Sequence, residues 1–414
     1  MINIAVLGHG VVGSGVVEVI NQNQESVAKN AGDSVRVKRI LDLREFDVPY
    51  ADIFTKDFND ILNDDEISVV AEVMGGVHPA YEFTKQALEH GKSVVTSNKE
   101  LVAQKGAELL ATAKAHNVNY YFEASVGGGI PIIRPMHLCL AANKIDEIAG
   151  ILNGTTNFIL TKMITEQMEF GAALKLAQEL GYAERNPEAD VEGHDACRKI
   201  CILASLAYGK HVYPEYVHTE GITNITLEDV EYAASNDCVI KLIGQVKALD
   251  DNGNLSCMVS PALISKQSQL AGIDDVFNGI LVRGNATGDV VFYGKGAGKL
   301  PTASAVVADI IDVSKAKGTS TSLTWTDDGQ NHVVDYLKTD SSYYVRVKAE
   351  ENVDWKAVIA GVFGEVTFLS RANQPEEEAA FVLDSINEQA LLDKEAELAN
   401  QNIRVLGKIR ILNY

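Results

Sequence analysis

The chain has 414 residues, 46% of them hydrophobic, and this is too long for one core, so two or three domains are expected. Its 57 acidic and 36 basic residues give a net charge of -21, and this surface repels polyanions. Nucleic acid and anionic membranes are therefore excluded as expected partners. The five cysteines are sparse and odd in number, which indicates reduced thiols without a disulfide framework.

The amino terminus runs from Met1 directly into apolar residues without a basic segment, and no apolar run approaches the length of a membrane span. We therefore expect no secretion signal, no membrane helix and a cytoplasmic location. Strand and helix patterns then alternate, which predicts an α/β fold with a doubly wound parallel sheet of the Rossmann type over residues 1–135. The predicted strands are 2–7, 35–41, 68–73, 93–96 and 119–123, the helices are 11–20, 79–90 and 100–116, and residues 21–34 form a polar connection.

The pattern changes near Leu138, and we expect an α+β domain over residues 136–315. Its predicted strands are 145–152, 255–263 and 289–293, and its helices are 157–166, 170–180, 195–208 and 302–313. The polar, aperiodic residues 316–340 are predicted to be a linker.

The last segment, residues 341–414, has the order βαββαβ, which is the ferredoxin-like arrangement. Its predicted strands are 343–349, 365–369, 380–384 and 403–412, and its helices are 354–363 and 388–400. This arrangement resembles the ACT module, a small-molecule-sensing domain that occurs on enzymes of amino-acid metabolism.

A glycine-rich turn, Gly8-x-Gly10-x-x-Gly13, follows the first strand and opens the first helix. These glycines permit a tight turn and close approach of the backbone to a pyrophosphate, with the helix N-terminus facing the anion. The predicted coenzyme-binding residues here are Gly8, Gly10, Val11, Val12 and Gly13. At the end of the second strand, Asp42 is placed to bond ribose hydroxyls and repel a 2′-phosphate, whereas Arg44 could attract one. The choice between NAD and NADP stays open.

Two further segments follow later strands. Thr96-Ser97-Asn98-Lys99 lies at the carboxyl end of a strand, where such sheets place ligands, although Lys99 alone is equally typical of a solvated loop. Glu123 precedes Val126-Gly127-Gly128-Gly129-Ile130-Pro131, whose carbonyls beside a carboxylate suit a hard cation. A glycine turn at a domain crossover is the alternative.

The segment 181–199 contains several carboxylates and a lysine at the start of an apolar helix. Asp195 and Lys199 are four residues apart, so they share one helix face, as a surface ion pair also would. The apolar continuation of the helix favours a partly buried Lys199, and a buried lysine has a lowered pKa and exchanges protons near neutral pH. A zinc site at Cys197 and Cys201 is rejected, because one C-x₃-C pair is poor zinc spacing.

With these motifs the chain resembles the homoserine dehydrogenase family, which interconverts L-aspartate 4-semialdehyde and L-homoserine with NAD(P), in the biosynthesis of threonine and methionine. The resemblance covers roughly residues 1–315. Its motifs are Gly8–Gly13, Thr96–Lys99, Gly127–Ile133, Gly150–Asn157, 181–199 and Gly296–Ala305.

The resemblance implies roles for individual residues. Residues 136–315 would be the catalytic and dimerisation domain. Lys199 would be the proton-transfer lysine, and Lys99 a second catalytic lysine that contacts coenzyme and substrate. Thr96 would also contact the coenzyme. Glu184 and Asp190 would bind the substrate's ammonium group, supported by Asp195. A sodium-type site would comprise Glu123 with the carbonyls of Val126, Gly128 and Ile130. A homo-oligomer, dimer or tetramer, is also implied.

The chain departs from the family pattern in three places. His9 replaces a small apolar residue in the glycine turn, and Arg185 and Asn186 stand where an acid is often found. Ala349–Asp354 replaces the Asp-x-Pro-Gly turn with which ACT modules bind effectors. Inhibition by threonine, which the resemblance implies, is thereby left open. Two other functions are also left open: an aspartate dehydrogenase-like enzyme, and a non-catalytic sensor of nucleotide and amino acid.

Overall fold

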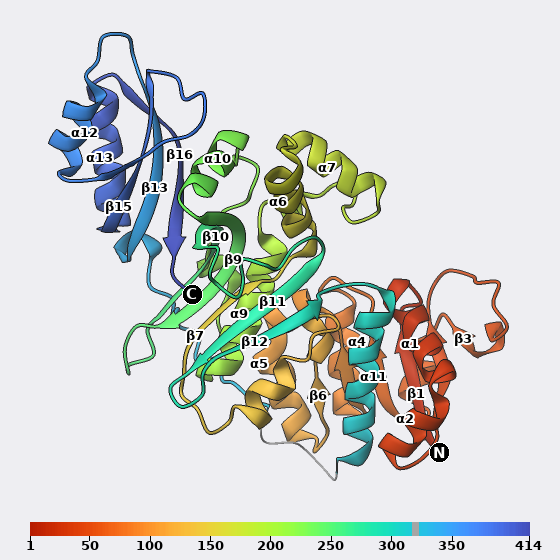
Figure 1. Cartoon of the computed structure of the whole chain (residues 1–414). Coiled ribbons are helices and arrows are strands. Elements are labelled where there is room, and N and C mark those ends of the chain that lie inside the picture. Colours follow the sequence, from red (N-terminus) through yellow and green to blue (C-terminus); the bar gives the residue numbers. More distant parts are fainter. Residues whose placement is uncertain (317–322) are drawn as a thin grey trace. The chain divides into compact units, whose positions relative to one another are not determined.

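Six parallel strands form the first sheet of the computed structural model, which describes residues 1–316 and 323–414 (Figure 1). Their order is β3-β2-β1-β4-β5-β6, with the first strand in the middle of the sheet. The strands are β1 (Ile2–Leu7), β2 (Val35–Leu41), β3 (Phe54–Thr55), β4 (Ile67–Glu72), β5 (Ser93–Thr96) and β6 (Tyr120–Tyr121). The predicted doubly wound parallel sheet is confirmed.

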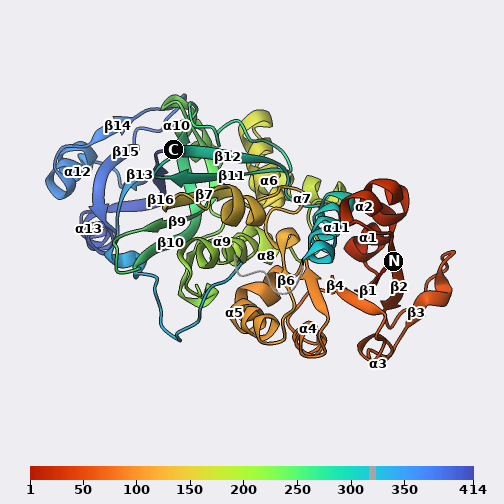
Figure 2. The ribbon, with the colours of Figure 1, turned by 90° about the horizontal axis from the view of Figure 1, so that it is seen from below.

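Helices cover both faces of this sheet, as Figure 2 shows. One face carries α1 (Val11–Gln22), α2 (Gln24–Ala31) and α11 (Lys299–Lys315), and the other carries α4 (Ala80–Glu89) and α5 (Lys99–Ala115), with the short α3 (Asn59–Leu62) nearby. The core on the first face joins distant parts of the chain. Val6 of β1, Val16 of α1 and Val306 of α11 are all fully buried there. Late residues therefore complete the fold of the first domain.

The polar connection predicted for residues 21–34 is wrong, because this segment contains α2. Its only buried apolar side chains are Val27 and Ala31, four residues apart, and they join the same core. Gly32 ends the helix in the left-handed conformation with φ of +83°. Two apolar positions are too few to reveal a helix by periodicity, and packing against the core is what stabilises it.

Eight strands of the second, mixed sheet follow one another in the order β11-β7-β9-β10-β16-β13-β15-β14. Its strands are β7 (Ile145–Ile151), β9 (Cys238–Ala248), β10 (Leu255–Ser265), β11 (Phe277–Gly284), β13 (Asp340–Ala349), β14 (Thr367–Leu369), β15 (Glu378–Asn387) and β16 (Ile403–Leu412), and β8 (His218–Thr219) pairs with β10. The other elements are β12 (Gly288–Lys295), α6 (Gly154–Glu166), α7 (Phe170–Glu179), α8 (Glu188–Val191), α9 (His194–Tyr208), α10 (Leu227–Ser235), α12 (Trp355–Phe363) and α13 (Glu388–Asn400).

The predicted βαββαβ arrangement of residues 341–414, called the C-terminal module below, is confirmed: its strands have the order β16-β13-β15-β14. Helices α12 and α13 cover one face of its sheet (Figure 1). Alternate residues of β13 face opposite ways. Tyr343, Val345 and Val347 enter the module's own core with Ile359 and Leu391.

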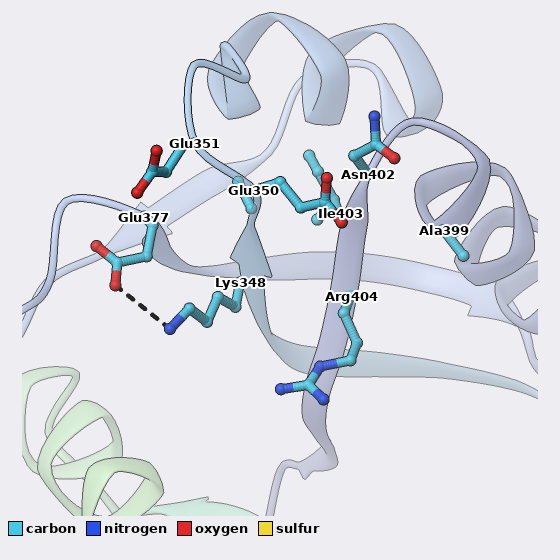
Figure 3. Close-up of a pocket in the computed structure, with 9 residues that line it drawn as sticks. Lys348, Glu350, Glu351, Glu377, Ala399, Asn402, Ile403 and Arg404 are labelled. Carbon is cyan, nitrogen blue, oxygen red and sulfur yellow. Dashed lines mark ion pairs between the residues drawn. The ribbon is translucent and has the colours of Figure 1, made fainter.

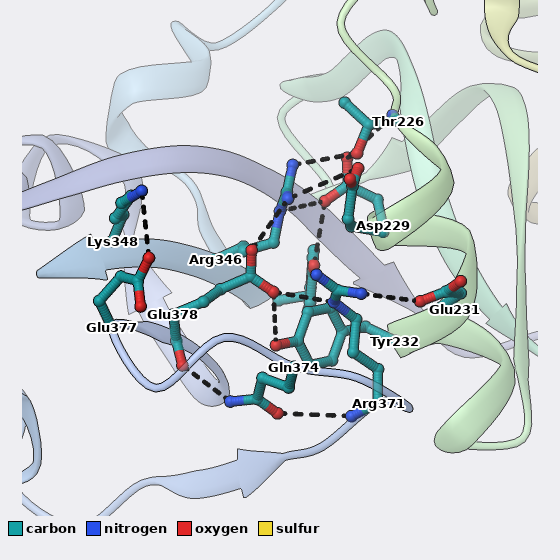
Figure 4. Close-up of polar contacts among 12 residues, drawn as sticks. Thr226, Asp229, Glu231, Tyr232, Arg346, Lys348, Arg371, Gln374, Glu377 and Glu378 are labelled. Carbon is teal, nitrogen blue, oxygen red and sulfur yellow. Dashed lines mark hydrogen bonds and ion pairs between the residues drawn. The ribbon is translucent and has the colours of Figure 1, made fainter.

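Tyr344 and Arg346, which alternate with these core residues along β13, face α10 instead. Figure 4 shows Arg346 paired with Asp229 of α10 at 3.0 Å, and the hydroxyl of Tyr344 donates to the same carboxylate at 3.0 Å. Glu378 of β15 accepts from Arg371 at 2.8 Å. In addition, β16 pairs in parallel with β10, so one hydrogen-bonded sheet continues from the earlier strands into the module.

The chain divides into two compact units. The first contains residues 1–146, 198–214 and 283–331, and the second contains 147–197, 215–282 and 332–414. The predicted domain boundaries at residues 135, 315 and 340 stay predictions. Within the predicted linker, Trp325 and Val333 are buried, and 317–322 lie outside the described residues. No described helix has the length and apolar character that crossing a bilayer requires.

Candidate functional site

A cavity of about 480 Å³ lies in the first unit, at the carboxyl ends of β1 and β2. Four predicted coenzyme-binding residues line it, Gly8, Gly10, Asp42 and Arg44. Gly10 is the N-cap of α1, so the free N–H groups of this helix terminus belong to the same turn. The cavity joins two predicted features, a helix N-terminus suited to a pyrophosphate and a strand-end carboxylate suited to a ribose.

The glycine turn is packed too closely for side chains at some positions. A Cβ on Gly13 would lie 1.9 Å from the carbonyl oxygen of Gly8, and Gly8 itself has φ of +91°. At Gly10, by contrast, nothing lies within 4 Å of an added Cβ. Val11 is exposed and Val12 is half-buried at the first turn of α1. Gly13 therefore serves the packing of the turn, whereas Gly10 leaves space open at its surface.

Asp42 is held by two of its neighbours. Its carboxylate accepts the backbone N–H of His9 at 2.8 Å and that of Arg44 at 3.0 Å. It also binds the Arg44 guanidinium through two hydrogen bonds, at 3.0 Å from Nε and 2.9 Å from Nη2. The hydrogen bond from Arg44 is the main reason that the pKa of Asp42 lies far below its ordinary value, although burial opposes it. The acid is thus ionised, and Arg44 is turned toward it.

The turn that leads into Lys99 is organised by Glu72, a carboxylate for which the sequence predicted no role. Glu72 is fully buried at the end of β4, and it accepts the hydroxyl hydrogen of Thr96 at 2.7 Å. Asn98 binds the same Thr96 hydroxyl through its backbone N–H at 2.9 Å and caps α5 by accepting from Leu101. Burial raises the pKa of Glu72. The sequence signal that could have identified Glu72 is a single carboxylate at the end of a largely apolar strand.

Lys99 and Lys199 come from helices that are tied together within the first unit. Lys99 is the first residue of α5 and is half-buried, and its neighbour Glu100 pairs with Arg198 of α9 at 3.7 Å. Lys199 follows Arg198 and is only 7% exposed. The expectation of a buried Lys199 is therefore met.

The second unit holds the predicted substrate carboxylates. Asn153 caps α6 with its side-chain oxygen, and its NH₂ group donates to Asp190 at 2.7 Å and to Asp195 at 3.0 Å. Asn153 belongs to the Gly150–Asn157 motif, but its sequence position alone did not predict this function. Glu184, the third predicted carboxylate, is exposed and is not part of this bridge. One amide thus brings together two carboxylates that lie in different helices.

Glu123 has a different environment from the one predicted. It is buried, and its two oxygens accept the backbone N–H groups of Ile132, Ile133 and Arg134 at 2.6, 2.8 and 2.8 Å. These three N–H groups satisfy both carboxylate oxygens without a cation, so the Glu123 side chain does not fit the role of a metal ligand. Among the described residues no group of three or more His, Cys, Asp or Glu side chains is arranged as a metal site. A cation on the carbonyls of residues 126, 128 and 130 stays a prediction.

Asp309 of α11 lies next to Glu123 and accepts its backbone N–H at 2.9 Å. Burial, followed by the charge of Glu123, raises the pKa of Asp309 to about 8. The ion pair with Arg134 at 2.7 Å acts in the opposite direction but is outweighed. The folded protein therefore keeps a proton on Asp309 at pH values where the unfolded chain, with an ordinary value of 3.8, has lost it.

This raised pKa predicts how stability changes with pH. The contribution of Asp309 is complete below about pH 4 and is lost as the pH rises toward 8, at up to about 1.4 kcal/mol per pH unit. We expect Asp309→Asn to flatten the fall of the unfolding free energy over this range, measured by denaturant unfolding at several pH values. Asp312 pairs with the same Arg134 but is partly exposed, so Asp312→Asn is the control. Equal slopes for Asp309→Asn and the wild type would contradict the assignment.

A second cavity, of about 620 Å³, lies in the C-terminal module. Figure 3 shows charged side chains of both signs around it, among them Lys348, Glu350 and Arg404, with Lys348 paired to Glu377 at 3.3 Å. The cavity includes the turn after β13, where the sequence departs from the ACT pattern. Such a lining suits a small ligand that carries both charges.

Family models and related proteins all indicate the same family for this chain. The family model described as homoserine dehydrogenase matches residues 131–311, and the model of the homoserine dehydrogenase NAD-binding domain matches residues 8–123. A homoserine dehydrogenase of Bacillus subtilis is 43% identical over 319 residues, 76% of this chain and 73% of that protein. One from Neisseria gonorrhoeae is 38% identical over 384 residues, 88% of this chain and 86% of that protein.

Solved structures show the same similarity. A homoserine dehydrogenase from Thiobacillus denitrificans has a TM-score of 0.88 at 34% identity, covering 100% of this chain and 98% of that one. One from S. aureus has a TM-score of 0.79 at 34% identity, covering 99% of each chain. A hyperthermophilic archaeal homoserine dehydrogenase in complex with NADPH has a TM-score of 0.66 at 28% identity, covering 77% of this chain and 99% of that one.

Proposed function

Since the chain belongs to the homoserine dehydrogenase family of oxidoreductases, we propose that it interconverts L-aspartate 4-semialdehyde and L-homoserine, a reaction for which a bound nicotinamide coenzyme supplies or accepts the hydride. The observation that carries the proposal is the Asn153 bridge, which fixes Asp190 and Asp195 side by side. An amino-acid substrate carries an ammonium group that needs anionic partners. Asp195 also lies in the first turn of α9, which carries Lys199 four residues further on.

Each side chain has one proposed role. Asp190 and Asp195 bind the ammonium group, with Glu184 as a further carboxylate at the loop. Lys199 gives a proton to the substrate oxygen as the aldehyde is reduced and removes it in the reverse direction. Lys99, held at the start of α5, stabilises the negative charge that develops on this oxygen.

The cavity at the glycine turn would hold the coenzyme. Gly8, Gly10, Val11, Val12 and Gly13 would receive the pyrophosphate at the N-terminus of α1, as the close packing of Gly13 and the open surface at Gly10 support. Thr96 and Lys99 would contact the coenzyme from the neighbouring loop. Asp42, which also lines this cavity, would accept hydrogen bonds from ribose hydroxyls.

The pairing of Asp42 with Arg44 predicts a change of coenzyme preference. The substitution Asp42→Asn removes a negative charge and releases Arg44 from its ion pair. Lys56 also lines this cavity. A 2′-phosphate then meets cations instead of a carboxylate, so the preference for NADPH over NADH should rise at least about tenfold. The ratio of kcat/KM for the two coenzymes measures this change. Arg44→Ala should move the ratio in the opposite direction, and an unchanged ratio in both variants would refute the assignment.

The reaction is tested by following the absorbance of NADH or NADPH with purified protein and L-aspartate 4-semialdehyde. Oxidation of either coenzyme supports the proposal. Coenzyme binding without oxidation would refute it, and oxaloacetate with ammonia would then test an aspartate dehydrogenase-like activity. Stabilisation by ligands without any turnover would favour a sensor.

We propose further that the C-terminal module is an ACT-like regulatory domain whose ligand occupies the 620 Å³ cavity. The βαββαβ order and the mixed charges around the cavity support this role. Adding L-threonine to the assay tests it: inhibition that is lost in Arg404→Ala supports the assignment, and insensitivity of the wild type to threonine removes this effector.

The remaining proposals follow the family. We propose a cytoplasmic enzyme of threonine and methionine biosynthesis that forms a dimer or tetramer, which light scattering during gel filtration would test. None of the roles given to Lys199, Lys99 or the carboxylates depends on a sodium ion.

A further inference from the structure

The last strand of the chain is connected to the segment that carries Asp190 and Asp195. In β16, Arg410 is 2% exposed, and its guanidinium binds two carboxylates, each at 2.8 Å. Glu388 belongs to the C-terminal module, whereas Glu220 follows β8 and lies outside it. Nε2 of His218 approaches the same Glu220 oxygen at 2.6 Å, and its ring stacks on Tyr336. The module thus holds Glu220 through a buried cation.

Residues 220–222 are fixed on both sides. The backbone N–H of Glu220 donates to Val259 of β10 at 2.8 Å, and the N–H of Ile222 donates to the carbonyl of Val191 at 2.8 Å. Gly221 packs closely against residues 191 and 192. A Cβ on Gly221 would come within 2.3 Å of the Val191 carbonyl oxygen and 2.6 Å of Glu192 Cα. A shift of Glu220 is therefore transmitted to residues 191 and 192.

Residues 191–193 form the connection between the two substrate carboxylates. Asp190 lies in α8 directly before it, and Asp195 lies in α9 directly after it. A Cβ on Gly193, at φ of +82°, would lie 3.2 Å from the Glu220 carbonyl oxygen. Because one Asn153 amide binds both carboxylates, a small displacement of this connection breaks at least one of its hydrogen bonds.

We propose that Glu220, held by Arg410, is a positioning residue for the amino-acid substrate, and that the C-terminal module sets substrate affinity through it. The proposal rests on the proposed function, in which Asp190 and Asp195 bind the substrate's ammonium group. Neither Glu220 nor Arg410 needs to touch the substrate. Their ion pair keeps residues 191–193 at the position where both carboxylates reach Asn153.

The chemistry of Glu220 agrees with this role. Burial alone would raise the pKa of Glu220, but the hydrogen bond from His218 and the charge of Arg410 outweigh it and lower the pKa to about 2. The side chain is thus a permanent anion. Arg410 can bridge two carboxylates because its guanidinium is a planar fork, which the single ammonium of a lysine cannot reproduce.

The experiment compares matched arginine variants. Arg410→Lys keeps the charge but loses the bridge, and we expect KM for L-homoserine to rise about 3- to 30-fold, more than kcat changes. KM for the coenzyme should not change, since neither Arg410 nor Glu220 lines the coenzyme cavity. Glu220→Leu should raise KM for L-homoserine at least as much, whereas Glu220→Gln, which keeps an acceptor for Arg410, should raise it less.

Arg346→Lys is the control, because Arg346 is also buried in the C-terminal module and also pairs with carboxylates. Its three partners, Glu228, Asp229 and Glu378, all lie outside residues 220–222 (Figure 4). It should lower the melting temperature without raising KM for L-homoserine. An equal rise in Arg346→Lys would overturn the proposal, since the effect would then be general loosening.

Asp195→Asn separates the two levels of inference. If Asp195→Asn raises KM for L-homoserine while Arg410→Lys and Glu220→Leu do not, the positioning role is wrong and the proposed function stands. If Asp195→Asn leaves KM unchanged, the substrate assignment itself is wrong and the positioning role is overturned with it. Should Glu220→Leu not fold, the comparison of Arg410→Lys with Arg346→Lys decides.

Discussion

Lys199→Ala is expected to lower kcat by about 10²–10⁴-fold, the usual contribution of a positioned proton donor or acceptor. Lys199 is almost fully buried on α9, four residues after Asp195, so water cannot easily replace its ammonium group. Coenzyme affinity, measured by quenching of protein fluorescence, should stay unchanged, because Lys199 does not line the coenzyme cavity. The loss should therefore fall on the chemical step, which a deuterated coenzyme would show as a larger isotope effect.

Arg198→Ala is the matched control for this variant. Arg198 precedes Lys199 on the same helix and pairs with Glu100 at 3.7 Å. Its removal breaks a partly exposed ion pair between α5 and α9, which contributes roughly 1 kcal/mol or less, so kcat should fall far less than in Lys199→Ala. Full activity of Lys199→Ala, or an equal loss in both variants, would rule out proton transfer by Lys199.

Gly13→Ala is expected to destabilise the first unit by roughly 3 kcal/mol or more and to remove most coenzyme binding. The added Cβ would lie 1.9 Å from a backbone oxygen of Gly8, so the turn itself must move. Because Gly8 lines the coenzyme cavity, its displacement should lower coenzyme affinity at least about tenfold. Denaturant unfolding and titration with NADPH measure the two effects.

Two other glycines separate stability from binding. Gly10→Ala has space for the new Cβ and should change the unfolding free energy by less than about 0.5 kcal/mol, yet weaken coenzyme binding, since Gly10 lines the cavity. Gly171→Ala in α7 also has space and lies outside the cavity, so binding should not change and stability should rise by up to about 1 kcal/mol. Wild-type stability of Gly13→Ala would refute the close packing of the turn.

Elements with strong local signals were predicted well. Strand β2, helix α13 and strand β16 have the predicted bounds, because each combines apolar periodicity with a polar residue where the element ends. The parallel sheet and the βαββαβ order followed from the alternation of such elements. The family followed in the same way, since its motifs are short local sequences, and the comparisons confirm it.

Elements and contacts that depend on distant parts of the chain were missed. Helix α2 is stabilised by packing against the core of the first sheet, and strands β9 and β11 were not assigned although both lie inside the second sheet. At the site, Glu72 and Asn153 were not given functions. Each acts through partners far along the chain, Glu72 on Thr96 and Asn153 on Asp190 and Asp195.

The sequence by itself determined the elements with strong local signals, the glycine turn and the family, because these depend on neighbouring residues and on side-chain chemistry that can be read along the chain. Only the tertiary structure decided which charges are bound to one another. It turned the carboxylate of Glu123 from the predicted cation toward three N–H groups, and it joined Arg410 to Glu220 across 190 positions. Buried charges must find partners within hydrogen-bond distance, and folding alone determines which distant groups come that close.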